Sequence, residues 1–319
     1  MTAGKRVLIT GGVGFLGTHL CPAIKDRAPY DVDLPRKRYR GFIDPQRTKS
    51  HFESAKLEIV IHLAVRARGI GDNRSSPSRF FYENAIMGIN VMEEARRAHV
   101  ERFVNIGTIC SYPKFTPVPF KEEDIWNGYP EETNAPYGIA KKALMVMGQA
   151  YRQQYGMNAI TLLPVNMYGP GDNFDPASSQ VIPAIPAIIR KVISAREGRQ
   201  SHIEAWGTGT ASREFLFVRD AAEGIARATE SYDEGEPINL DSGMEITIKD
   251  LTELICDVCN YSGKIHWDTT KPDGQPRRLL DSSKAQAKLG FSAPTDFRTG
   301  LRETIGWYEG VRSKQEKGM

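Results

Sequence analysis

Short apolar runs rich in β-branched residues alternate along the chain with longer segments that have helical spacing. The runs, which predict strands, are at 6–10, 31–34, 58–64, 102–108 and 159–165. In 79–100 and 137–155, apolar residues recur three or four positions apart, which predicts two long helices. Alternating strands and helices are typical of a parallel sheet covered on both faces. With right-handed crossovers, the pattern predicts an α/β fold with a Rossmann-type, doubly wound parallel sheet.

The pattern changes after Pro164. Residues 168–206 are rich in Pro, Gly and Ser, and two later runs, 213–220 and 237–241, look like strands that return to the sheet. We therefore expect a first domain made of 1–165 and the returning strands at about 207–241. A smaller, discontinuous C-terminal domain would consist of 166–206 and 242–319. The two long helices have wide apolar faces, which core packing mostly explains and which also suit a homodimer interface.

Composition excludes several classes of protein. The 319 residues are 40% hydrophobic and 25% charged, with a net charge of +3. This nearly neutral balance shows no excess of positive charge of the kind that binds nucleic acid or an anionic membrane. The chain also has no run of 18 apolar residues that would cross a membrane. The first residues enter a strand almost at once and leave no room for a signal peptide, so a cytoplasmic location is expected. Cys256 and Cys259 form a CxxC without a second pair, so we expect core packing and no metal site.

A glycine-rich turn, TGGVGFLG, directly follows the first predicted strand. Gly11, Gly14 and Gly17 are three residues apart, with Phe15 and Leu16 between the last two. A dinucleotide diphosphate must approach backbone amides at a helix N-terminus, where side chains would obstruct it. The position between a strand and a helix supports a dinucleotide site over a turn that binds nothing.

Charges after the second strand bear on which dinucleotide binds. Asp33 could accept hydrogen bonds from the adenosine ribose, which favours NAD. Arg36, Lys37 and Arg38 could instead hold a 2′-phosphate, which favours NADP. Three cations outweigh one carboxylate, so we favour NADP(H), with NAD(H) still possible.

Three residues suit proton transfer. Tyr137 and Lys141 lie four positions apart on one face of a predicted helix, and Thr108 ends the fourth strand. A nearby ammonium group favours the phenolate of a tyrosine, and such a phenol can exchange a proton with a sugar hydroxyl or keto oxygen.

The turn TGGVGFLG, Thr108 and the string PYGIAK resemble the extended short-chain dehydrogenase/reductase family. Further strings, including GTICSYPK, LPVNMYGPGDNFDPASS, WGTGTASREFLFVRDAA and KPDGQPRRLLD, are similar to the branch that epimerises and reduces GDP-4-keto-6-deoxymannose. The similarity covers nearly the whole chain. It implies that Thr108, Tyr137 and Lys141 form the catalytic triad and that Lys141 also holds the nicotinamide ribose.

The same resemblance implies a role for Cys110. In that branch, a cysteine at this place works with a histidine to invert C3 and C5 of the sugar. Here the string that should contain the histidine reads SSQVIPA, with Gln180 in its place. An amide has no proton to give near neutral pH, so the sequence leaves open whether this chain can invert both C3 and C5.

Binding residues also follow from the resemblance. For the cofactor these are Arg36, Ile43, Asp44, Leu63, Ala64, Val65, Pro164, Asn166 and Met167, besides the glycine turn. For a nucleotide-linked sugar, with GDP favoured, they are Asn166, Gln180, Arg190, Lys191, Trp206, Arg213 and Lys271. Two other functions remain open: a redox-neutral nucleotide-sugar 4-epimerase, which needs no histidine, and a cofactor-binding sensor without catalysis.

Overall fold

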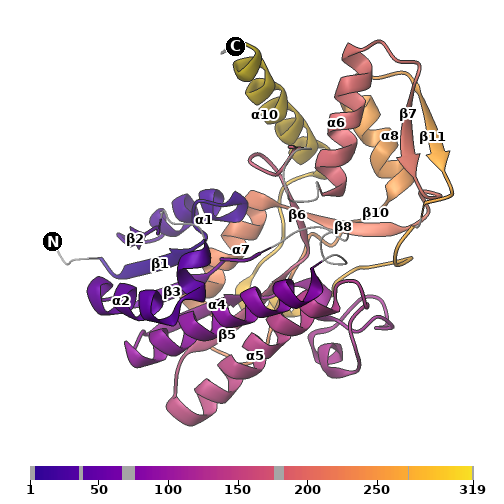
Figure 1. Ribbon diagram of the computed structural model, residues 1–319. Coiled ribbons are helices and arrows are strands. Elements are labelled where there is room, and N and C mark those ends of the chain that lie inside the picture. The colour runs from indigo at the N-terminus through magenta and orange to yellow at the C-terminus, as the bar shows by residue number, and fades with distance from the viewer. Residues whose placement is uncertain (1–3, 36–38, 67–75, 176–182, 272, 318–319) are drawn as a thin grey trace.

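A six-stranded sheet forms the centre of the molecule (Figure 1). The structure, a computed structural model, describes residues 4–35, 39–66, 76–175, 183–271 and 273–317. The strands lie in the order β2-β1-β3-β4-β5-β9, and every neighbouring pair is parallel. Their bounds are β1 (Arg6–Thr10), β2 (Asp31–Asp33), β3 (Ile59–His62), β4 (Arg102–Ile106), β5 (Ala159–Pro164) and β9 (Ile238–Leu240). The predicted parallel α/β fold is confirmed.

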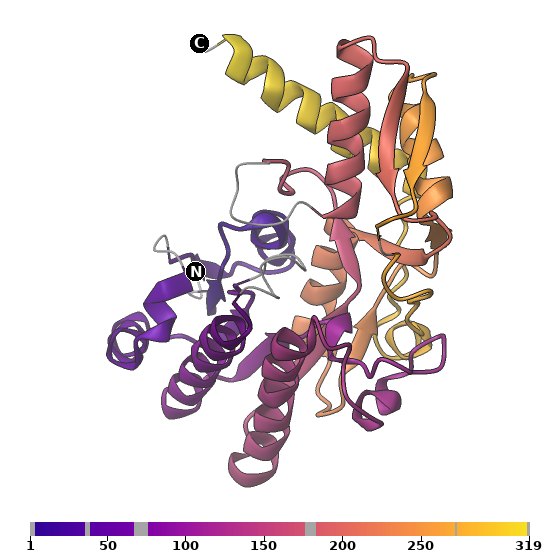
Figure 2. The ribbon, with the colours of Figure 1, turned by 45° about the vertical axis from the view of Figure 1, so that its right-hand side comes forward.

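Helices cover both faces of this sheet, and for that reason β3 and β5 are buried along their whole length. One face carries α1 (Phe15–Lys25) and α7 (Val218–Ser231), which pack against each other. The other carries α2 (Pro45–Ala55), α4 (Pro77–Arg97) and α5 (Ala135–Tyr155) (Figure 2).

The first predicted long helix ends earlier than its apolar pattern suggested. Helix α4 stops at Arg97, and His99 has a positive φ of 52°. The backbone N–H of Val100 then returns to the carbonyl of Ala95 at 3.1 Å. Such a left-handed residue satisfies the last carbonyls of a helix, so Val100 packs as an apolar residue after the helix.

Two smaller sheets stand beyond the central one. One has the order β10-β8-β6, and in the other β7 pairs with β11 in parallel. The bounds are β6 (Asn166–Tyr168), β7 (His202–Trp206), β8 (Ser212–Phe217), β10 (Glu245–Thr247) and β11 (Lys264–Asp268). A second apolar core, with Tyr168, Ile189, Phe215 and Leu301, fills the space between these sheets and three helices. They are α6 (Ala184–Glu197), α8 (Ile248–Val258) and α10 (Phe297–Lys317). Three shorter segments complete the elements used below: η1 (Tyr39–Ile43), η2 (Ile109–Ser111) and α9 (Ser283–Leu289).

One prediction about these strands was wrong. We expected both 213–220 and 237–241 to return to the central sheet, but only β9 does so. Strand β8 pairs with β6 in parallel and with β10 antiparallel. Because β9 already occupies the edge of β5, β8 pairs with β6, which leaves the sheet just after β5.

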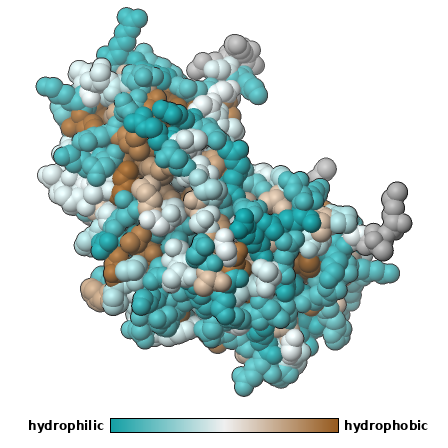
Figure 3. All heavy atoms as spheres, turned by 180° about the vertical axis from the view of Figure 1, so that it is seen from behind, coloured by the Kyte–Doolittle hydropathy of each residue, from teal (hydrophilic) through white to brown (hydrophobic). Residues whose placement is uncertain are grey.

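The CxxC cysteines of α8 serve packing, as expected. Both Cys256 and Cys259 are buried, and burial raises the pKa of the two thiols to about 11 and about 12. In the described ranges, no three His, Cys, Asp or Glu side chains are grouped as a metal site would require. The helices of these ranges also include none long and apolar enough to cross a membrane, and the back of the molecule is largely hydrophilic (Figure 3).

A pair of buried carboxyl groups joins the central sheet to β8. Glu214 is fully buried and accepts hydrogen bonds from the backbone N–H groups of Ser242 (3.0 Å), Gly243 (2.8 Å) and Leu280 (3.1 Å). Asp241 is 2% exposed. Burial, and next the charge of Glu214, raise the pKa of Asp241 to about 8.

The Asp241→Asn variant should be more stable than the wild type, and the gain should grow with pH. The folded chain keeps a proton on Asp241 that the unfolded chain releases above about pH 4, so wild-type stability falls as pH rises to about 8. One pKa unit corresponds to about 1.4 kcal/mol, so the gain should be about 2–4 kcal/mol larger at pH 8 than at pH 5. Urea unfolding at both pH values measures it. The exposed Asp26→Asn is the control, and equal gains at the two pH values would contradict the assignment.

Candidate active site

The glycine turn lies where the chain changes direction across the sheet. After β1 the chain forms β2 on one side and then crosses to β3 on the other, so the carboxyl ends of β1 and β3 flank a switch point. Ligands of open parallel sheets bind at such points. Residues 11–17 follow β1 at this edge (Figure 1).

Gly11, Gly14 and Gly17 of the turn each leave space that a side chain would fill. Gly11 has a φ of 73°, and a Cβ there would lie 2.9 Å from the backbone nitrogen of Ala64. A Cβ on Gly17 would lie 2.4 Å from Cα of Gly12. Gly14 precedes α1 without a side-chain cap, so the first-turn N–H groups of Phe15 and its neighbours are open to an anion. The turn therefore fits the diphosphate of a dinucleotide.

The end of β3 borders this turn, as predicted. The backbone N–H of Ala64 donates to Oγ1 of Thr10 at 3.1 Å, and that of Leu63 donates to the Thr10 carbonyl at 3.1 Å. Val65 follows on the same segment. These bonds bring the predicted cofactor residues of two strands together.

The predicted adenine-side residues have structural contacts. The Asp44 carboxylate caps α2 by accepting from the N–H groups of Gln46 (2.9 Å) and Arg47 (3.1 Å). The Ile43 carbonyl accepts from Nδ2 of Asn90 at 3.1 Å. Asp33 lies 2.9 Å from Nε2 of His51. Arg36, Lys37 and Arg38 are outside the described residues.

Thr108, Tyr137 and Lys141 come together beside β4. Lys141 is 3% exposed, and its Nζ donates to the carbonyl of Ile106 at 2.8 Å. Burial lowers the pKa of Lys141 to about 8. Burial also raises the pKa of Tyr137, the neighbouring Cys110 raises it further, and a hydrogen bond with Thr108 opposes them. Burial therefore favours the protonated phenol of Tyr137 over the expected phenolate in this structure, and the phenol is hydrogen-bonded with Thr108.

Cys110 sits next to this triad. It lies in η2, where its backbone N–H donates to Oγ1 of Thr108 at 3.2 Å. The turn is pressed against α5, since a Cβ on Gly138 would lie 2.3 Å from the Cys110 carbonyl oxygen. Cys110 is partly exposed, whereas the other three cysteines are buried. Gln180 lies outside the described residues.

Three predicted substrate residues meet around an exposed tryptophan. Trp206 ends β7 and is 61% exposed. The Nζ atoms of Lys191 and Lys271 lie 5.6 Å and 5.8 Å from the centre of its ring. Lys191 is also anchored to the carbonyl of Glu204 at 3.0 Å. An exposed aromatic ring with two ammonium groups near it suits a planar base linked to phosphates.

The remaining predicted substrate and cofactor residues lie at several places in the structure. Arg190 lines, together with Lys191, a cavity of about 340 Å³ between α6 and β7. Pro164 is buried at the end of β5. Asn166 is exposed and donates from Nδ2 to the Glu214 carbonyl at 3.2 Å, and Met167 packs against the central core.

Arg213 faces a second arginine that sequence reasoning missed. The pKa of Arg213 falls to about 10, first because of burial and next because of the positive charge of Arg278. Nη1 of Arg213 donates to the Ser212 carbonyl at 2.6 Å, and Nη2 of Arg278 donates to the Ile109 carbonyl at 2.9 Å. Two neighbouring guanidinium groups suit an anion with several oxygens, such as a diphosphate. The RR pair at 277–278 was the available signal, but Arg277 is turned away to Glu245.

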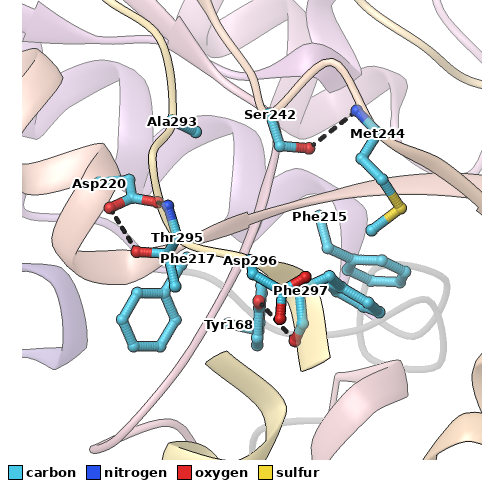
Figure 4. A pocket seen from close by; sticks show the side chains of 10 residues that line it. All are labelled: Tyr168, Phe215, Phe217, Asp220, Ser242, Met244, Ala293, Thr295, Asp296 and Phe297. Atoms are coloured by element: carbon cyan, nitrogen blue, oxygen red, sulfur yellow. Dashed lines mark hydrogen bonds between the residues drawn. The ribbon is translucent and has the colours of Figure 1, made fainter. Parts of the chain in front are cut away.

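A cavity of about 210 Å³ lies apart from all predicted site residues (Figure 4). It is lined mainly by the rings of Tyr168, Phe215, Phe217 and Phe297, and at one side Thr295 donates to Asp220 at 2.8 Å. This lining belongs to the second core, so the cavity is not part of the candidate site.

The chain is similar to known proteins over nearly its whole length. The chain is 36% identical to a putative GDP-L-fucose synthase 2 of Arabidopsis thaliana, over 98% of this chain and 94% of that protein. It is 32% identical to the GDP-L-fucose synthase of Escherichia coli, over 95% and 96%. A GDP-mannoheptose C4 reductase from Campylobacter jejuni, solved with NADP bound, superposes with a TM-score of 0.86 and 26% identity, over 97% and 99% of the two chains. Residues 7–241 match the profile of the NAD dependent epimerase/dehydratase family. The chain belongs to this family.

Proposed function

We propose that this protein is an NADP(H)-dependent enzyme that reduces the 4-keto group of a GDP-linked hexose, with epimerisation limited by Gln180. The observation that carries the proposal is the placement of Thr108 and Tyr137 beside the partly exposed Cys110. The names of the relatives, GDP-L-fucose synthases and a GDP-mannoheptose C4 reductase, support the substrate class.

The first part of the chain, 1–165 with β9, would hold the cofactor. The turn at 11–17 would bind its diphosphate through backbone amides, and Lys141 would hold the nicotinamide ribose. The bound cofactor supplies the hydride. The NADP found in the C4 reductase and the cations Arg36, Lys37 and Arg38 favour the phosphorylated form.

Tyr137 performs the proton transfer. Because its phenol is neutral and hydrogen-bonded to Thr108, it can donate a proton to the C4 oxygen as that oxygen gains charge. The Thr108 hydroxyl contacts the same oxygen and orients it. The buried ammonium group of Lys141 then stabilises the phenolate that remains.

Cys110 would remove a proton from a carbon beside the keto group, where such protons are acidic. Inversion also needs a proton returned from the opposite side, which an amide at position 180 cannot supply and which water would have to supply. We therefore propose that Cys110 epimerises at most one centre.

The substrate lies across the second part of the chain, 166–206 and 242–319, together with β8, which pairs with β6 and β10. Trp206, with Lys191 and Lys271 near its ring, takes the base, while Arg213 and Arg278 take the diphosphate. This places the sugar towards η2 and Cys110, because Arg278 contacts Ile109.

We also propose a homodimer through α4 and α5. Tyr82 and Ile89 on α4 and Val146 on α5 are 59%, 40% and 49% exposed, and such an apolar face can pair with its own copy. Sedimentation should show a dimer for the wild type and for the loop variant Phe115→Glu, but a monomer for Val146→Glu. A monomeric wild type would contradict the proposal.

A single incubation in heavy water tests the proposed function. Protein, NADPH and GDP-4-keto-6-deoxymannose are mixed, and NADPH absorbance and product mass are followed together. We expect NADPH oxidation with one carbon-bound deuterium at most from epimerisation. No NADPH oxidation with this substrate would overturn the reductase proposal, and deuterium at both C3 and C5 would overturn the proposed limit set by Gln180.

A further inference from the structure

One peptide group beside the active site is held from both ends. The Ile109 carbonyl oxygen accepts from Nη2 of Arg278 at 2.9 Å. The N–H of the same peptide group, which belongs to Cys110, donates to Oγ1 of Thr108 at 3.2 Å. The Ile109 carbonyl also accepts from the Tyr112 N–H at the end of η2, at 3.2 Å. The orientation of this peptide plane, and with it the position of the Cys110 thiol, therefore depends on a catalytic hydroxyl, on the turn of η2 and on Arg278.

The backbone on both sides of Arg278 is held by hydrogen bonds to other parts of the chain. The Pro276 carbonyl accepts from the Ser212 N–H at 2.9 Å, and the Leu279 carbonyl accepts from the Phe120 N–H at 2.8 Å. The Leu280 N–H donates to the buried Glu214 at 3.1 Å. Movement at this position is therefore largely left to the arginine side chain.

The Arg278 side chain has unused donor capacity. Its Nε is buried and forms no hydrogen bond with any described residue. Its charge acts on Arg213, whose own pKa it lowers. Repulsion between two guanidinium groups is relieved when an anion lies between them, so an anion would fix Arg278 in place.

We infer that Arg278 is a positioning residue that couples the diphosphate to Cys110. When a nucleoside diphosphate bridges Arg213 and Arg278, the Arg278 side chain is fixed, the Ile109–Cys110 peptide is clamped, and the thiol is set for proton transfer. The inference rests on the proposed function for the identity of the anion. The coupling itself depends only on the contacts of Arg278.

Alkylation of Cys110 measures the coupling without turnover. Iodoacetamide is added with and without saturating GDP, and the modified peptide is quantified by mass spectrometry, since the other three cysteines are buried. GDP carries no sugar and so leaves the thiol side of the site open. In the wild type, GDP should slow alkylation of Cys110 by about threefold to tenfold, as expected for one strengthened hydrogen bond.

Variants separate positioning from simple shielding or loss of affinity. In Arg278→Met, alkylation without GDP should be about threefold or more faster, and GDP at a concentration that saturates this variant should no longer slow it. Arg278→Lys should recover much of the GDP affinity but not the effect on Cys110, because one ammonium group cannot serve both partners. Arg277→Met is the matched control: it lies next in sequence, pairs with Glu245 at 2.7 Å, and should behave like the wild type.

The outcomes are distinguishable. Full slowing by saturating GDP in Arg278→Met or Arg278→Lys would overturn the inference, as would an absence of slowing in the wild type with GDP bound. If GDP does not bind the wild type, the proposed substrate class fails. The alkylation rates without GDP then decide the positioning role alone, and equal rates in Arg278→Met and wild type would refute it.

Discussion

The Tyr137→Phe variant is expected to lose about 10²–10⁴-fold in kcat, the usual contribution of a positioned general acid. Only the hydroxyl is removed, so the ring still packs in its place on α5. Without it, the C4 oxygen has no proton donor when hydride arrives, and Thr108 has no phenol to orient. Steady-state oxidation of NADPH with GDP-4-keto-6-deoxymannose measures the loss.

The effect should be confined to chemistry. Titration of the cofactor by fluorescence should give the same affinity for Tyr137→Phe and wild type within about twofold, since the phenol contributes little to cofactor binding. Tyr129→Phe is the matched control, because Tyr129 is an exposed loop residue, and this variant should keep full activity. A Tyr137→Phe enzyme with more than about a tenth of wild-type kcat would show that another group donates the proton.

Local spacing explains the parts that the sequence predicted well. The glycine turn is read from seven consecutive residues between a strand and a helix, and Tyr137 and Lys141 are one helical turn apart. Their meeting with Thr108 depends on η2, which follows β4 directly and packs against α5.

Long-range contacts explain the rest. The partners of β8 depend on β9 taking the edge of β5, and no local pattern reports that competition. Arg278 is 169 residues from Ile109 along the chain, and only the folded structure shows that it and not Arg277 turns inward. The sequence also suggested that Lys141 would favour the phenolate, whereas burial is the largest influence on the pKa of Tyr137 and raises it.

The Gly17→Ala variant should bind NADPH at least about tenfold more weakly and should be less stable by about 1–3 kcal/mol, the usual cost of an extra methyl group in a tight contact. The new Cβ would stand 2.4 Å from Cα and 2.5 Å from the carbonyl atoms of Gly12. These are backbone atoms of the phosphate-binding turn itself, so no side chain can move aside. Either α1 or the turn must shift, and both carry the amides that face the cofactor diphosphate.

Gly306→Ala is the matched control for this change. Gly306 lies in α10, and a Cβ added there would meet no atom within 4 Å, so alanine should leave NADPH affinity unchanged and should slightly stabilise the helix. Calorimetric titration with NADPH and thermal unfolding of both variants give the two measurements. If Gly17→Ala keeps wild-type affinity, then the contact between α1 and Gly12 does not set the geometry of the cofactor site. If it loses affinity without losing stability, the shift is confined to the turn, and the amides of Phe15 and Leu16 are what the cofactor needs in place.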